Sequence, residues 1–297
     1  MNVTRKVSGF ALLALGLILG NARNAGAQAP AAAQDANAPK YTLAEYNSYK
    51  ACEGEANPAA KIKCLDDFVS KYPNSTLLKF VYPLYTQSYG AQKNYAKVME
   101  YADKYAAQGG IEPGDHFNAC YTHAAAYSAL LQDPAQKTAA ADPAIAKAAQ
   151  TAAACALDIL PQVKKPDNVA DDAWAKQVVQ FKTFLNGVNA QASMVAKDCA
   201  GAVTSYKAIL ALNPDDAISS YQLGRAYLCT NPAQQIDAFW SIARAVTSKT
   251  ATQAQSDKVK KYLKSLIVNY QGGNVCDSLT DGELNELLQL AGSAVDR

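Results

Sequence analysis

The sequence predicts an all-α protein made of antiparallel helix pairs, and three observations support this prediction. Fifty-eight of the 297 residues are alanine, the strongest helix former, and the short β-branched runs typical of sheet proteins are missing. From Thr42 onward, apolar residues recur at three- and four-residue spacing, as on one face of a helix. Turn signals made of Pro, Gly and Asn interrupt this pattern repeatedly, as expected for many helices of moderate length.

The first 27 residues are predicted to be a signal peptide. Two basic residues precede an apolar run of 12 residues, 9–20, which is too short to span a bilayer because about 20 residues are needed. Ala25, Gly26 and Ala27 then form a small-residue cleavage site, so we expect cleavage after Ala27. The protein is therefore expected in the periplasm or outside the cell. An uncleaved membrane anchor is the alternative, and the length of the run disfavours it.

The segment that follows the signal peptide is predicted to be a disordered linker. Residues 28–40 consist largely of Ala, Pro and Gln without a large apolar side chain, so they cannot bury a core. Without residues 1–27 the chain has 25 basic and 26 acidic residues, a net charge of −1. This balance argues against a nucleic-acid partner and against attraction to anionic lipid. No integral membrane span is expected after signal cleavage.

Capping and stop signals set the expected helix boundaries in residues 41–297. The first helix begins at Thr42, because Thr42 and Glu45 form a capping box in which each side chain satisfies the other residue's backbone N–H. Later helices end at turns containing Asn-Pro, Tyr-Pro-Asn, Gly-Gly or Asp-Pro. Short connections make sequential helices antiparallel neighbours. The predicted helices are 42–55, 58–71, 75–90, 94–107, 115–131, 142–160, 168–195, 198–212, 216–229, 233–247, 251–269 and 280–292.

An internal repeat is visible near residue 200. In residues 199–214 (CAGAVTSYKAILALNP), the apolar face of a helix ends at Pro214. The next helix carries Leu-Gly-x-x-Tyr at 223–227, and Ala190 precedes Gly224 by 34 residues at the equivalent small-residue position. This pattern resembles the tetratricopeptide repeat (TPR), with its Leu-Gly-x2-Tyr, Ala-x3-Phe and Pro positions over 34 residues. The apolar face of the helix in residues 199–214 carries Ala202, Tyr206 and Ile209.

The resemblance is clearest over residues 183–247 and looser over residues 42–107. Residues 132–171 do not match the repeat pattern, and residues 251–297 are expected to provide capping helices. It departs from the family pattern at the first aromatic position, where Asn186 and Ser220 stand. The helix after Gly224 also begins two residues late. We therefore expect a register in which Ala238, Ile242 and Ala245 are buried and Arg244 reaches water, instead of one that buries Ile236, Trp240 and Ala243.

The resemblance implies a right-handed superhelix of antiparallel helix hairpins, a TPR-like α-solenoid that binds a protein or peptide on its concave face. The Lys/Asn cluster that grips a peptide carboxylate in some relatives is absent, so capture of a peptide C-terminus is not expected. A closer alternative is a structural component of outer-membrane assembly, as in the repeat proteins of that machinery. The register implies the following concave, partner-binding residues: Phe184, Val188, Gln191, Ile218, Tyr221, Gln222 and Arg225.

Six of the seven cysteines form three pairs that each straddle a predicted turn symmetrically. Facing residues of an antiparallel helix pair lie equally far from the turn, and the midpoints of three consecutive pairs fall at 58, 137.5 and 214. An exported protein meets an oxidising compartment, so we expect disulfides. The alternative is that each cysteine is a small buried hydrophobic residue. The expected bridges are Cys52–Cys64, Cys120–Cys155 and Cys199–Cys229, with Cys276 free.

The chain offers little catalytic chemistry. Both histidines lie on one predicted helix, as His116, Cys120 and His123, but the first and last are about 10 Å apart along the axis. One ion therefore cannot bind all three without a second helix, and we predict no metal site. Asp115 is expected to cap this helix, with His116 exposed and His123 packed or hydrogen-bonded. No nucleophile, phosphate-binding or zinc motif occurs, so neither an enzyme nor a cofactor is predicted.

The tyrosines of the chain allow two interpretations. The chain has 17 Tyr against 7 Phe, and Tyr82, Tyr85 and Tyr89 share one helical face. This face is either core, which helical spacing usually means, or a binding surface suited to the polar tip of tyrosine.

A function of another class, an envelope enzyme or glycan binder, would use residues 110–171. Convergent acidic residues in a pocket there would favour it.

Overall fold

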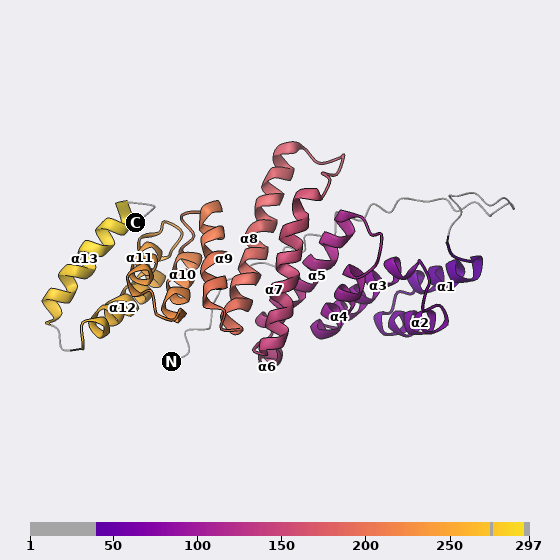
Figure 1. Cartoon of the computed structure of the whole chain (residues 1–297), viewed down its shortest axis with the longest axis horizontal. Helices are drawn as coiled ribbons and strands as arrows, with labels where there is room; N and C mark the ends of the chain where they lie inside the picture. Colours follow the sequence, from indigo (N-terminus) through magenta and orange to yellow (C-terminus); the bar gives the residue numbers. More distant parts are fainter. Residues whose placement is uncertain (1–39, 274–275, 294–297) are drawn as a thin grey trace.

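The computed structural model describes residues 40–273 and 276–293. The predicted signal peptide, its cleavage after Ala27 and nearly all of the predicted linker lie outside these ranges. Figure 1 shows the helices following one another along an elongated stack. All regular elements of the described residues are helical. They are α1 (Leu43–Gly54), α2 (Pro58–Lys71), α3 (Leu78–Ala91), α4 (Tyr95–Ala106), α5 (Pro113–Gln132), η1 (Pro134–Gln136), α6 (Lys137–Ala140), α7 (Pro143–Ile159), η2 (Leu160–Gln162), α8 (Asp171–Val195), α9 (Cys199–Leu212), α10 (Ala217–Cys229), α11 (Gln235–Thr247), α12 (Gln253–Tyr270) and α13 (Asp277–Ser293).

Polar caps set most of the helix starts. The predicted capping box at α1 is formed, with Thr42 N–H donating to Glu45 and Glu45 N–H donating to the Thr42 hydroxyl at 3.2 Å. Asn57 accepts the first free N–H groups of α2, and Asp198 and Asp216 do the same for α9 and α10. Each cap satisfies backbone donors that the first turn of a helix leaves unpaired. These residues therefore fix where the hairpins turn.

Every helix packs against the next one in the chain, which confirms the all-α class and the sequential pairing. Beyond this order, α5 also contacts α7 and α8, and α13 folds back against α11. The buried side chains form four separate clusters along the stack instead of one central core. Such an arrangement is typical of a repeat protein, in which each unit is stabilised by its neighbours. None of the helices described has the length and apolar content needed to cross a bilayer.

The repeat register is confirmed in α9, α10 and α11. Tyr206 and Tyr227 are both about one-twentieth exposed and lie in the same buried cluster. Ala238, Ile242 and Ala245 are buried, whereas Ile236 is 50% exposed, as the two-residue shift predicts. Ala243, which the rejected register would bury, is buried as well. The shift follows from the α10–α11 connection, in which the chain passes through residues 230–234 before α11 begins.

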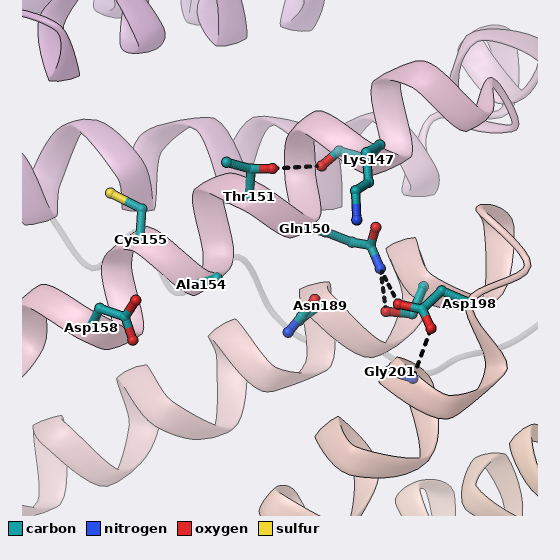
Figure 2. A pocket seen from close by; sticks show the side chains of 10 residues that line it. Lys147, Gln150, Thr151, Ala154, Cys155, Asp158, Asn189, Asp198 and Gly201 are labelled. Atoms are coloured by element: carbon teal, nitrogen blue, oxygen red, sulfur yellow. Dashed lines mark hydrogen bonds between the residues drawn. The ribbon is translucent and has the colours of Figure 1, made fainter.

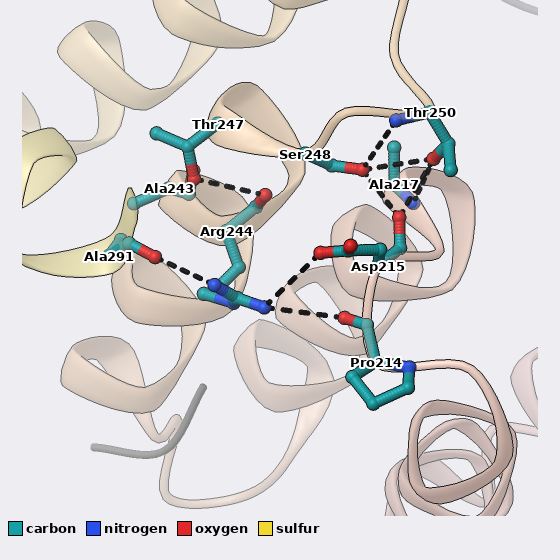
Figure 3. Close-up of polar contacts among 9 residues, drawn as sticks. All are labelled: Pro214, Asp215, Ala217, Ala243, Arg244, Thr247, Ser248, Thr250 and Ala291. Atoms are coloured by element: carbon teal, nitrogen blue, oxygen red, sulfur yellow. Dashed lines mark hydrogen bonds and ion pairs between the residues drawn. The ribbon is translucent and has the colours of Figure 1, made fainter. Parts of the chain in front are cut away.

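The prediction for Arg244 is wrong. Its side chain is only 14% exposed, and its guanidinium donates to the Ala291 carbonyl at 2.8 Å and to the Pro214 carbonyl at 3.3 Å (Figure 3). A carboxylate oxygen of Asp215 lies 3.8 Å away. The reason is that α13 folds back over α11 and covers this position. Arg244 thereby joins the last helix to the turn that precedes α10.

The region after α5 differs from the predicted loop 132–141. It contains the 3-10 turn η1 and the four-residue helix α6, both missed by the sequence analysis. Asp133 caps η1 through the Ala135 N–H, and the Tyr127 hydroxyl donates to the Ala140 carbonyl at 3.3 Å. Ala140 is buried, so a long-range contact with α5 holds this short helix. Helix α5 itself begins earlier than expected, at Pro113 after Glu112, so Asp115 lies in its first turn and does not cap it.

Candidate functional site

The predicted concave residues separate into a group on α8 and a group on α10, and both helices pack against α9. On α8, Phe184 is half-buried with its ring centroid 5.2 Å from that of Tyr121, and Gln191 is exposed. Val188 is only 3% exposed and belongs to the largest buried cluster. Its predicted role as a surface contact is therefore wrong, because α5 and α7 pack beside α8 and cover this face.

The group on α10 forms a surface together with α12. Ile218 is 47% exposed, and Arg225 is exposed and donates to the Gln222 side-chain oxygen at 3.1 Å. The ring of Tyr221 meets that of Tyr262 edge to face, with centroids 6.0 Å apart and an interplanar angle of 68°. Burial raises the pKa of Tyr262, and the nearby Arg225 partly offsets this rise. We call Ile218, Tyr221, Gln222, Arg225 and Tyr262 the α10/α12 surface.

Tyr262 is the member of this surface that the sequence analysis missed. Its helix lies outside the clear repeats, so the repeat register assigned it no position. The α10/α12 surface combines an exposed aliphatic side chain, an aromatic pair with polar tips and a cation held by a neighbouring amide. These groups suit a polypeptide, because aromatic residues and Arg supply most of the binding energy in protein interfaces.

A cleft lies where α7, α8 and α9 meet. It has a volume of about 500 Å³ and is lined mainly by polar residues, although apolar atoms make up most of its wall. Figure 2 shows the Gln150 side chain near its centre, where the amide donates to the Ser193 hydroxyl at 2.6 Å and to Asp198 at 3.2 Å. The side-chain oxygen of Gln150 is buried without a hydrogen-bond partner. The lining residues are Lys147, Gln150, Thr151, Ala154, Cys155, Asp158, Asn189, Ser193, Asp198 and Gly201.

The two acidic residues of this cleft do not converge. Asp198 contacts Gln150, whereas Asp158 lies eight residues further along α7, about 12 Å along the helix axis. Asp198 also caps α9 through the Gly201 N–H at 3.0 Å, so its carboxylate has a structural role. Figure 2 places the two carboxylates at opposite ends of the cleft. The convergent acids that would favour an enzyme in residues 110–171 do not occur in this cleft.

The tyrosines of α3 pack mainly into the core. Tyr85 is 1% exposed, and its hydroxyl donates to an Asp66 carboxylate oxygen at 2.7 Å. Its ring stacks on that of Tyr101 from α4 with centroids 3.9 Å apart, and the ring of Tyr89 lies 5.5 Å from the same residue. Tyr82 is half-buried at the edge of this cluster. Packing is therefore the better supported of the two interpretations of this helical face.

The three predicted disulfides are present. The Cα atoms of Cys52–Cys64, Cys120–Cys155 and Cys199–Cys229 are 5.3, 6.0 and 5.6 Å apart, within the range that a bridge requires. Cys276 is free and exposed, as expected. Hydrogen bonds from the side chain and backbone of Ser278 and from the backbone of Leu279 lower the pKa of the Cys276 thiol.

The two histidines have different surroundings. His123 is 2% exposed, and its Nδ1 lies 2.7 Å from an Asp103 carboxylate oxygen of α4. His116 contacts a different helix, and its Nε2 lies 3.7 Å from the Cys155 sulfur of α7. The structure thus separates the two histidines and places His116 beside the Cys120–Cys155 bridge. Sequence reasoning missed this juxtaposition, although the predicted Cys120–Cys155 bridge and the four-residue spacing of His116 and Cys120 together indicate it.

The fold and surfaces define an all-α helical-repeat protein whose clearest hairpins have TPR-like register. Among known proteins, no family model matches the chain. No curated protein matches it in sequence either. Among solved structures, it is similar to the C-terminal part of a TPR repeat-containing protein from Cytophaga hutchinsonii, with 14% sequence identity and a TM-score of 0.32. That similarity covers 84% of this chain and 96% of the other.

Proposed function

We propose that this protein is an exported, non-enzymatic scaffold that binds a protein or peptide partner in the cell envelope. The observation that carries the proposal is the α10/α12 surface. Ile218 exposes about half of its side chain there, next to the Tyr221–Tyr262 pair and Arg225. An aliphatic anchor, aromatic rings and a guanidinium are the groups most often found at the centre of protein interfaces.

The packing beneath this surface supports the same proposal. Leu223 and Tyr227 of α10 are buried against α9, so the helix that presents Ile218 and Tyr221 is held from behind. On the other side, Tyr221 lies in the cluster that α11, α12 and α13 form. A preformed surface loses little conformational entropy on binding, because few side chains must be ordered. The hydrogen bond to Gln222 also restrains Arg225 before a partner arrives.

The charges of the surface indicate the kind of segment it would take. Arg225 offers a cation beside apolar groups, so an acidic side chain next to aliphatic or aromatic ones would be complementary. The three disulfides support a location in an oxidising compartment. Phe184 and Gln191 of α8 would extend the contact only if a partner reached past α9 from the α10/α12 surface.

A pair of matched variants tests the proposal. Ile218→Asp places a charge in the α10/α12 surface, and Ile236→Asp places the same charge at a residue of α11 that is 50% exposed and outside it. Each purified protein is used to capture partners from an envelope extract. A partner should be retained by the wild type and Ile236→Asp but bind Ile218→Asp at least about tenfold more weakly, a loss of about 1.4 kcal/mol. Equal capture by all three proteins would exclude this surface as the binding site.

Export is tested separately. N-terminal sequencing of the protein recovered from the envelope fraction should give a chain that starts at Gln28. A chain in that fraction that still begins with Met1 would contradict cleavage. This result would leave the binding surface unaffected, so the two parts of the proposal can fail independently.

A further inference from the structure

Three soft metal ligands meet between α5 and α7. The Nε2 atom of His116 and the sulfur atoms of Cys120 and Cys155 all lie within 4.8 Å of one another. His116 and Cys120 are four residues apart on α5, so they share a face, and Cys155 comes from α7, which packs against α5. The third ligand thus arrives from a second helix, which the sequence analysis had required for any metal site.

The spacing of these ligands suits tetrahedral zinc. Zn–S and Zn–N bonds of 2.3 and 2.0–2.1 Å place a sulfur and a nitrogen ligand about 3.6 Å apart at the tetrahedral angle. The observed distance between Cys155 Sγ and His116 Nε2 is 3.7 Å. The distance between His116 and Cys155 therefore already matches the separation of two ligands on one zinc ion. The one missing requirement is cleavage of the disulfide, because zinc binds cysteine sulfur as a thiolate.

We propose that reduction of the Cys120–Cys155 disulfide turns this cluster into a Cys₂His site for Zn²⁺, with water as the fourth ligand. A dithiol reductant supplies two electrons and two protons, becomes a disulfide itself and leaves two thiols on the protein. Zn²⁺ then binds both sulfurs as thiolates, releases their two protons to solvent and accepts the lone pair of neutral His116 Nε2. Oxidation of the thiols reverses the change and expels the metal.

The other two bridges lack this arrangement. In residues 40–273 and 276–293, His116, Cys120 and Cys155 are the one group of three or more His, Cys, Asp or Glu residues whose ligand atoms lie this close together. Reduction of Cys52–Cys64 or Cys199–Cys229 therefore gives a pair of thiols without a third ligand beside it. His116 is half-buried, and Cys155 lies on the wall of the α7/α8/α9 cleft (Figure 2), so the cluster lies near solvent.

The test measures which cysteines Zn²⁺ protects from alkylation. The full chain is reduced with a phosphine under native conditions and mixed with one equivalent of Zn²⁺. Alkylation is then followed peptide by peptide, and far-UV circular dichroism monitors helix content. Zn²⁺ should slow alkylation of Cys120 and Cys155 by at least about tenfold, because a thiolate that binds the metal no longer acts as a free nucleophile. Cys276 serves as the unprotected reference.

Two neighbouring variants separate metal ligation from a general effect on α5. His116→Asn should lose most of the protection of Cys120 and Cys155, whereas Asp115→Asn should retain it. Equal protection in both variants would overturn the proposal, as would equal protection of all three reduced pairs. Should reduction unfold the chain, Zn²⁺ must restore helix in the wild type but not in His116→Asn. Failure to do so would also overturn the proposal.

Discussion

Gly224 marks the closest approach of α10 and α11, and replacing it with alanine should destabilise the protein. A Cβ atom at this position would lie 2.4 Å from Ile242 Cγ1 and 2.8 Å from the Ala238 carbonyl oxygen. Ile242 is fully buried, and Ala238 contributes backbone, so neither can move aside easily. Overpacking of this kind costs about 1–3 kcal/mol. The higher helix propensity of alanine offsets about 1 kcal/mol of that cost.

Gly187 provides the matched control. It also lies inside a helix, α8, but an added Cβ would meet no atom within 4 Å. Gly187→Ala should therefore stabilise the protein by up to about 1 kcal/mol through helix propensity alone. Urea denaturation of the oxidised proteins gives both midpoints, and the two variants should differ by about 1–3 kcal/mol. A Gly224→Ala midpoint equal to or above that of Gly187→Ala would show that the helices do not touch at this residue.

Three further predictions concern contacts outside the hairpin core. Arg244→Ala should lower the free energy of unfolding by about 1.5–3 kcal/mol, because it removes the charged hydrogen bond to α13. Amide exchange in α13 should become faster, and unchanged exchange would contradict the role of Arg244. Tyr85→Phe removes the hydroxyl that donates to Asp66, so the urea midpoint should fall by the equivalent of about 1 kcal/mol. Because Ser278 lowers the pKa of Cys276, Ser278→Ala should move the pH midpoint of Cys276 alkylation to higher pH; a midpoint that stays in place or falls would refute this assignment.

The sequence allowed the hairpins to be predicted because local signals determine them. The capping box at Thr42 and the turn at Asn57-Pro58 act within four residues, and both are present. The symmetric placement of cysteines about turns predicted all three bridges for the same reason, since each bridge closes over one or two neighbouring turns. The two-residue shift after Gly224 was also predicted, although the reason for choosing it, an Arg244 side chain that reaches water, is wrong.

What the sequence could not provide depends on contacts between distant segments. Arg244 is covered because α13 folds back on α11, and no local pattern announces that packing. Val188 is buried because α8 adjoins both α5 and α7, so a register taken from isolated repeats misplaces it. Tyr262 belongs to a helix without a recognised repeat, and His116 was considered only with the other residues of its own helix. The candidate binding surface was therefore predicted on α10, whereas its α12 half and the His116 neighbourhood required the structure.

The order of the disulfides has a consequence for how the chain acquires them. Six cysteines allow 15 pairings, and the one observed joins first to second, third to fourth and fifth to sixth in chain order. A chain that emerges from its amino end into an oxidising compartment meets its cysteines in that same order. Each correct partner is then the nearest thiol still unpaired, so simple stepwise oxidation yields the native bridges without shuffling. A dedicated disulfide isomerase should be dispensable for this protein's maturation.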